Sequence, residues 1–125
     1  MNIGCGACHT PTLTTGSSQF PALANQTIHP YSDFELDHMG SGLADSVSQG
    51  LAGCDEFRTA PLWGLGQRLF FLYEGRATNL MEAIIEHFSF GNFRYQPSSA
   101  DEVVMNFVFS SASDKQAILN FLRSL

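Results

Sequence analysis

The feature that most constrains this chain is a cluster of two cysteines and a histidine near its start, Cys5-Gly-Ala-Cys8-His9. Within about one helical turn, thiols at this spacing point the same way, and each can add to a vinyl group of one porphyrin. The histidine that follows then supplies the proximal ligand of the iron. The spacing therefore predicts one covalently attached haem c, held by Cys5, Cys8 and His9, around which the chain must fold.

Two other uses of a Cys-x-x-Cys pair fit this sequence less well. A zinc site would need a second pair of ligands, and the only further cysteine is Cys54, alone. A thioredoxin-like dithiol would follow a strand, and only four residues precede Cys5. Cys54 is expected to be a buried thiol, with an intermolecular disulfide as the alternative.

Length and composition limit the function further. The 125 residues predict a single domain over residues 1–125. Apolar residues make up 44% of the chain and include eleven Phe, which suits the lining of a flat apolar group. The net charge of −6 argues against nucleic acid. It favours docking onto a basic redox partner or within a larger redox assembly. The oligomeric state is left open.

Localisation follows from the haem motif rather than from a targeting segment. No apolar run approaches the roughly 20 residues of a membrane span, so no transmembrane segment is expected. Haem is attached to such motifs outside the bacterial cytoplasm, or in the mitochondrial intermembrane space. The chain is therefore expected to be periplasmic or otherwise extracytoplasmic, with its leader absent from this sequence.

The residue pattern predicts an all-α domain with long loops that wrap the haem. Residues 10–32 are rich in Thr, Ser and Pro and predict an irregular loop, and a short turn or helix is expected over residues 43–49. No segment alternates convincingly as a strand. A terminal helix is expected to pack across a first helix that carries the haem motif. Three patterns predict capped helix starts: Asn79-Leu-Met-Glu82, Ser99-Ala-Asp-Glu102 and Ser113-Asp-Lys-Gln116.

The distal ligand of the iron decides the role of such a haem. Methionine gives a high-potential electron carrier, histidine a lower potential, and an open site permits peroxide or oxygen chemistry. Met39 lies in a glycine-flanked loop that could bring it to the iron, and adjacent His38 is its direct rival. The other candidates are more typical of packing or structural roles. They are Met81, Met105, His29 and His87.

Two residues near the middle of the chain are candidates to hold the haem propionates. Arg58 offers a guanidinium and Trp63 an indole N–H, and both groups only donate hydrogen bonds. A surface salt bridge for Arg58 and a core position for Trp63 are the alternatives. Because the chain has only six Lys and Arg in all, the propionate role is favoured for Arg58. Arg76 is a weaker candidate of the same kind.

Several motifs in order resemble one known group. They are Cys5-Gly-Ala-Cys-His-Thr-Pro11, Asn25-Gln-Thr-Ile-His-Pro-Tyr31, Met39-Gly-Ser-Gly-Leu-Ala-Asp45, Phe57-Arg-Thr-Ala-Pro-Leu-Trp-Gly-Leu-Gly66, Glu74-Gly-Arg-Ala77 and Phe121-Leu-Arg-Ser-Leu125. Over essentially the whole chain, the sequence resembles the C-terminal haem domain of the bacterial di-haem c-type oxidoreductases. This group includes thiol oxidoreductases and di-haem peroxidases.

The resemblance implies a class I cytochrome c-like helical fold, periplasmic placement and a redox role. Cys5, Cys8 and His9 match the family's haem ligands, Met39 matches its methionine before glycine, and Arg58 matches the arginine of its Phe-Arg-Thr motif. In the peroxidase relatives the C-terminal haem relays electrons, and peroxide is reduced at a second haem in the preceding domain.

The chain also departs from the family. It has one haem motif where members carry two, and Tyr73-Glu74-Gly75 where they usually read His-Asp-Gly. We therefore expect a monohaem electron-transfer domain with His9 and Met39 as axial ligands, and an electron carrier rather than a self-sufficient peroxidase. One alternative is the C-terminal half or a subunit of a di-haem peroxidase or oxidoreductase. Another is a haem sensor with an open distal site.

Overall fold

The fold combines short helices with two small antiparallel sheets. The structure is a computed structural model that describes residues 3–125. Only 33% of the chain is helical, and the prediction of an all-α domain is wrong. In chain order the elements are η1 (Cys5–Ala7), β1 (Leu13–Thr14), η2 (Pro21–Leu23), β2 (Thr27–Ile28), β3 (Leu36–His38), α1 (Gly40–Leu43), β4 (Glu56–Arg58), η3 (Leu65–Gln67), α2 (Leu80–Ile85), α3 (Asp101–Phe109) and α4 (Ala112–Ser124).

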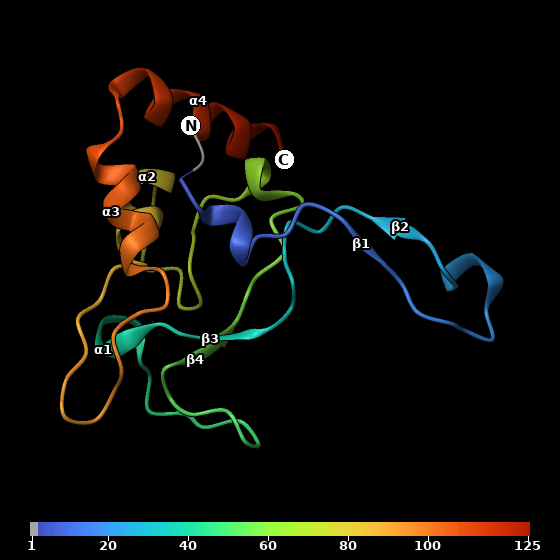
Figure 1. The fold of residues 1–125 in the computed structure, drawn as a ribbon, viewed down its shortest axis with the longest axis horizontal. Coiled ribbons are helices and arrows are strands. Elements are labelled where there is room, and N and C mark those ends of the chain that lie inside the picture. The colour runs from blue at the N-terminus through green and yellow to red at the C-terminus, as the bar shows by residue number, and fades with distance from the viewer. Residues whose placement is uncertain (1–2) are drawn as a thin grey trace.

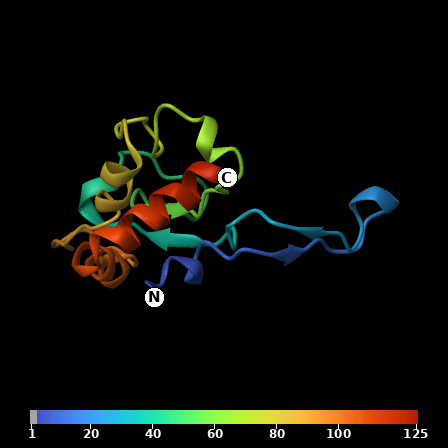
Figure 2. The same cartoon turned by 90° about the horizontal axis from the view of Figure 1, so that it is seen from above.

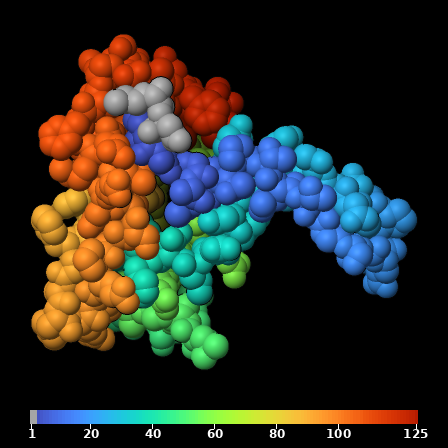
Figure 3. All heavy atoms as spheres, in the orientation of Figure 1, coloured from blue at the N-terminus to red at the C-terminus, as the bar shows by residue number. Residues whose placement is uncertain are grey.

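The first sheet forms an arm that projects from the body of the molecule (Figures 1 and 2). Strands β1 and β2 pair antiparallel, with Leu13 opposite Ile28 and Thr14 opposite Thr27. These β-branched and apolar residues favour extended backbone, and Pro21 starts the 3-10 turn at the tip. The segment predicted to be an irregular loop is thus a hairpin, and the space-filling view shows it standing away from the other elements (Figure 3).

The second sheet joins the segment before α1 to the middle of the chain. Strands β3 and β4 are antiparallel, with Leu36 opposite Arg58 and His38 opposite Glu56. The backbone N–H of Met39 extends the ladder by donating to the Asp55 carbonyl at 2.8 Å. Helix α1 follows at once and is only four residues long. It lies just before the segment for which a short helix was predicted.

The three later helices start close to the predicted positions, but only two have a side-chain cap. Asn79 caps α2, its side chain accepting from the Glu82 N–H at 2.8 Å. Helix α3 starts after Ala100, which makes no side-chain cap, because Ser99 lies one residue too early. The cap of α4 is Ser111 rather than Ser113, and it accepts from the Asp114 N–H at 3.1 Å.

The main core lies where α2, η3 and α4 meet. Its buried members are Leu65, Phe71, Ala77, Leu80 and Ala83, and leucines of α4 pack against them. The terminal helix α4 was expected to cross a first helix carrying the haem motif. Instead it packs on η3 and α2, and the motif occupies the 3-10 turn η1 (Figure 1). No helix among residues 3–125 has the length and apolar character to cross a membrane.

Candidate haem site

The Cys5–His9 motif is wound into a single tight turn. The N–H of Ala7 donates to the Gly4 carbonyl at 3.0 Å, and the N–H of His9 donates to the Cys5 carbonyl at 2.9 Å. Gly4 opens the turn with φ +112°, a conformation that other residues rarely adopt. Both thiols are free, Cys5 being the more exposed. The predicted attachment residues therefore sit on one turn, as thioether formation with one porphyrin requires.

The electrostatics of the two thiols argue against a redox dithiol. Burial, the hydrogen-bonded Asp37 and the charges of Asp33 and Glu35 raise the pKa of Cys8 to about 11. Partial desolvation also raises the pKa of Cys5. Reactive dithiols need a lowered pKa. Within residues 3–125, moreover, no three His, Cys, Asp or Glu side chains converge as a metal cluster of their own.

His9 is held in the tautomer that a haem iron needs. Its Nδ1 lies 2.9 Å from the backbone carbonyl oxygen of Tyr31. Because a carbonyl only accepts hydrogen bonds, Nδ1 must carry the proton, and the lone pair of the neutral ring is on Nε2. Histidines that bind metals are oriented in this way by a partner of the other ring nitrogen.

A second histidine, His87, lies near His9 and has the same tautomer. Its Nδ1 donates to the Ala83 carbonyl at 2.7 Å, one turn back along α2. Burial lowers the pKa of His87, and the proximity of His9 lowers it further. Its ring is therefore neutral near pH 7, with the lone pair on Nε2. Each of the two imidazoles can therefore offer a lone pair on Nε2.

The two distal candidates favoured by the sequence occupy different environments. His38 has both ring nitrogens beside carboxylates, with Nδ1 2.9 Å from Asp55 and Nε2 3.6 Å from Glu56. Its Nε2 could bind iron only by giving up the Glu56 contact, whereas the Nδ1–Asp55 bond could stay. Met39 is buried, with 8% of its surface exposed, and it starts α1 next to the end of α2. There the Ser89 hydroxyl oxygen accepts the Gly42 N–H at 2.7 Å.

Residues 98 and 99 join the Met39 segment to the His87 segment. The Ser98 hydroxyl donates to the His87 carbonyl at 2.6 Å. The next N–H, that of Ser99, donates to the His38 carbonyl at 2.8 Å. Both candidate distal ligands, Met39 and His87, therefore lie around the C-terminal end of α2.

The candidate propionate ligands differ in their exposure and in whether they already have hydrogen-bond partners. Arg58 is exposed at the end of β4, and Trp63 is 51% exposed. Arg76 pairs with Glu74 at 2.8 Å and also donates to the Gly42 carbonyl at 2.8 Å, so its guanidinium already ties the 74–76 turn to α1. Tyr73, at the position where the family usually has histidine, is exposed and packs on Phe57 at 5.8 Å between ring centroids.

Many large apolar side chains remain exposed on the segments that carry the candidate ligands. A flat apolar cofactor would bury such surface, at about 25 cal/mol per Å². The small size of the main core is also consistent with a fold that buries part of its apolar surface against a cofactor. The residues concerned are Phe34, Leu36, Trp63, Met81, Ile85 and Phe90.

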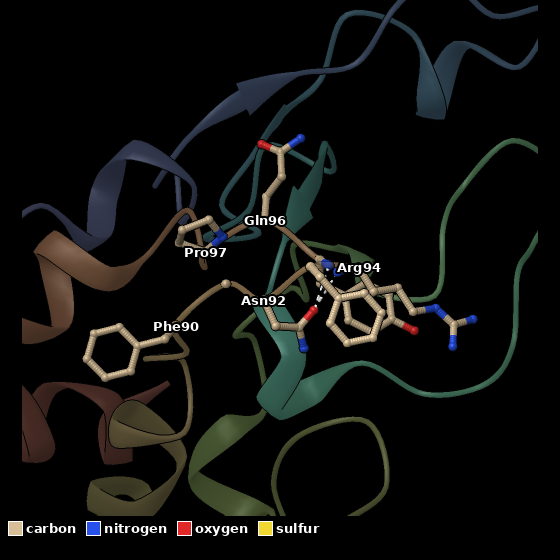
Figure 4. Close-up of a pocket in the computed structure, with 8 residues that line it drawn as sticks. Phe90, Asn92, Arg94, Gln96 and Pro97 are labelled. Carbon is tan, nitrogen blue, oxygen red and sulfur yellow. Dashed lines mark hydrogen bonds between the residues drawn. The ribbon is translucent and has the colours of Figure 1, made fainter.

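A pocket of about 570 Å³ lies elsewhere, in the loop after α2. Eight consecutive residues, 90–97, line it, and none is a candidate haem ligand (Figure 4). Asn92 shapes the loop by accepting the N–H groups of Arg94 and Tyr95 at 2.8 and 2.9 Å. Arg94 stacks on the Tyr95 ring. We assign this pocket no role in binding the haem.

The paired thiols, the oriented His9 and the exposed apolar surface are typical of c-type haem proteins. The comparison with protein families makes the assignment more specific. The chain belongs to the family described as "Di-haem oxidoreductase, putative peroxidase", whose model matches residues 1–125. The name of this family indicates haem binding and oxidoreductase chemistry. The match confirms the resemblance to the di-haem oxidoreductases that was predicted from the sequence motifs. The comparisons with curated proteins and with solved structures found no match.

The sequence predicted a packing role for His87, and its burial and its bond to the Ala83 carbonyl agree with that role; Tyr31 was not among the predicted site residues. His87 sits at helical spacing with apolar residues, a pattern typical of packing, and its approach to His9 arises only on folding. Tyr31 acts through its backbone carbonyl, which leaves no side-chain signature.

Proposed function

We propose that this chain is a c-type haem domain that relays single electrons in an extracytoplasmic redox system. Cys5 and Cys8 would hold one haem covalently, and His9 would be its proximal ligand. The observation that carries the proposal is the His9 Nδ1–H donated to the Tyr31 carbonyl, which leaves Nε2 free for iron. The haem, when bound, supplies a reversible one-electron couple.

The chain's own residues would orient the haem and keep water from it. His9 is fixed by the Tyr31 carbonyl, and the apolar side chains of α2 and of the segment before β3 would cover the macrocycle. Arg58 and Trp63 are proposed to donate hydrogen bonds to the propionates. The net charge of −6 would favour a basic redox partner.

For the distal position we propose His87 in place of the Met39 predicted from the sequence. The support is its nearness to His9 and its free Nε2 lone pair. Two histidines would give a lower reduction potential than a histidine and a methionine. Met39 is the second candidate, supported by its burial and by its place at the same end of α2.

The enzyme alternative has its own support. The family is described as di-haem, and this chain has a single haem motif. The chain would then be one half or subunit of an oxidoreductase, relaying electrons to a second haem held elsewhere. The electron-relay role of this haem is the same in both cases.

The visible spectrum of the oxidised, haem-loaded protein tests these assignments. With His87 as ligand, the iron is low-spin and lacks the weak long-wavelength band that methionine ligation gives. His87→Ala should produce high-spin iron, whereas Met39→Ala should leave the spectrum unchanged. Met105→Ala is the control, because Met105 lies on α3, is partly exposed and is not among the residues proposed to cover the haem.

Other outcomes would change the account in defined ways. A methionine band that disappears in Met39→Ala would refute His87 and leave a His9/Met39 electron carrier. High-spin iron in the parent protein would contradict the electron relay and favour a peroxidase or sensor with an open distal site.

A further inference from the structure

The carbonyl that holds His9 belongs to a residue in an uncommon backbone conformation. Tyr31 has φ +52°, in the left-handed region that residues with bulky side chains rarely adopt. Such residues persist only where the surrounding structure fixes them, and they cluster at functional sites. The cause of the Tyr31 conformation should therefore lie in its neighbours.

The next residue, Ser32, is the most tightly held part of this turn. It has no exposed surface, and its hydroxyl donates to the Thr59 carbonyl at 2.7 Å. The same oxygen accepts the Phe34 N–H at 2.9 Å. Replacing this hydroxyl would leave the buried Thr59 carbonyl and the Phe34 N–H without this partner.

Backbone bonds fasten the same turn to the haem motif. The Ser32 N–H donates to the Thr10 carbonyl at 3.0 Å, and the Asp33 N–H donates to the Cys8 carbonyl at 2.9 Å. Together with the His9 bond, these contacts join the turn to three consecutive residues of the motif, Cys8 to Thr10. The turn and the motif must therefore move as one unit.

Two further contacts fix the turn from the opposite side. Pro30 is fully buried, and its carbonyl accepts the Leu62 N–H at 2.9 Å. The Tyr31 ring meets the Phe121 ring of α4 edge to face, at 5.6 Å between centroids. The position of the Tyr31 carbonyl is thus set by the segment after β4 and by α4, both far away in the sequence.

We propose that Tyr31 and Ser32 are positioning residues that set the reduction potential through His9. The inference rests on the proposed function. The hydrogen bonds of the Ser32 hydroxyl fix the turn and keep Tyr31 in its left-handed conformation. The Tyr31 carbonyl then accepts the hydrogen bond from His9 Nδ1–H in a constant direction. A hydrogen bond to Nδ1–H makes Nε2 a stronger electron donor, which favours the oxidised iron. Loosening the turn weakens this bond and raises the potential.

The test is the reduction potential of the haem-loaded protein with Ser32→Ala, measured by spectroelectrochemical titration. The matched control is Ser110→Ala, which also removes a buried hydroxyl that donates to a backbone carbonyl, that of Phe107 at 2.7 Å. We expect both variants to lose thermal stability, and only Ser32→Ala to shift the potential upward. An unchanged potential in Ser32→Ala, or an equal shift in both variants, overturns the proposal.

Amide hydrogen exchange in the unsubstituted haem-loaded protein tests whether the turn at residues 31–33 is rigid, even if Ser32→Ala does not fold. The Ser32 and Asp33 amides should exchange far more slowly than the Leu23 amide, which bonds at the exposed tip of the arm. Equal rates would show that the turn is not held, and would overturn the proposal. If no haem attaches at all, the proposed function fails; if haem attaches and only these results are negative, the inference alone fails.

Discussion

At the scale of single residues, backbone carbonyls fix the tautomers of two candidate ligand histidines, His9 and His87. His9 donates to the Tyr31 carbonyl and His87 to the Ala83 carbonyl, so both imidazoles keep their lone pair on Nε2. His38, between Asp55 and Glu56, is engaged at both nitrogens. The three histidines therefore differ in the hydrogen-bond partners of their ring nitrogens: His9 and His87 face one backbone carbonyl each, and His38 faces two carboxylates.

The cap of α2 allows a direct test of how stably the helix just before His87 is held. Asn79→Ala removes the acceptor of the Glu82 N–H and should lower the free energy of unfolding by about 1 kcal/mol. Urea unfolding followed by circular dichroism measures the change. Asn79→Ser is the control, because serine also caps and should keep most of the stability. An equal loss in both variants would contradict the role of the cap.

How much of the site was predictable depends on how local each signal is. Cys5, Cys8 and His9 form a contiguous motif, so the sequence alone identifies them as a unit. The approach of His87 to His9 depends on packing between segments nearly eighty residues apart, which no spacing rule encodes. The engagement of Arg76 with Glu74 and Gly42 likewise arises from the turn that the chain makes there.

At the scale of elements, the sequence predicts the starts of the helices better than the positions of the strands. The Asn79 cap is local and was predicted correctly, whereas Ser111 took the place of Ser113 because serine recurs along that stretch. The strands are two or three residues long, too short to show alternation. Thr27 and Ile28 form a strand because Leu13 and Thr14 pair with them, a long-range contact.

The packing of η3 on α4 depends on a glycine. A Cβ on Gly66 would collide with the backbone carbonyl of Arg123, so the two elements can approach only if residue 66 has no side chain. Gly66→Ala should push α4 away from η3 and destabilise the fold by about 1–3 kcal/mol. Thermal unfolding measures the loss.

Gly16→Ala is the matched control for Gly66→Ala. Gly16 lies in the arm, where a Cβ would meet no atom within 4 Å. This variant should unfold close to the parent temperature. If Gly66→Ala were as stable as Gly16→Ala, the close approach of η3 and α4 would not be needed for stability.

At the scale of the whole molecule, the chain leaves apolar surface exposed around a small core. Some of the exposed side chains lie on the segments that carry the candidate ligands and others on the arm and the loops, and the main core among residues 3–125 has five buried members. A covalently held haem would supply the missing apolar partner. The predicted all-α architecture failed because haem attachment constrains only one turn, and the threonine-rich segment after it was free to form the arm.

The central claim is that this chain holds one haem through Cys5 and Cys8. The most direct measurement is the mass of the intact protein after expression with a c-type haem maturation system, followed by acidic solvent extraction of non-covalent haem. The account predicts a mass increase of one haem that resists extraction, and its loss in the Cys5→Ser/Cys8→Ser double variant. An unmodified parent chain, or a double variant that keeps extraction-resistant haem, would contradict it.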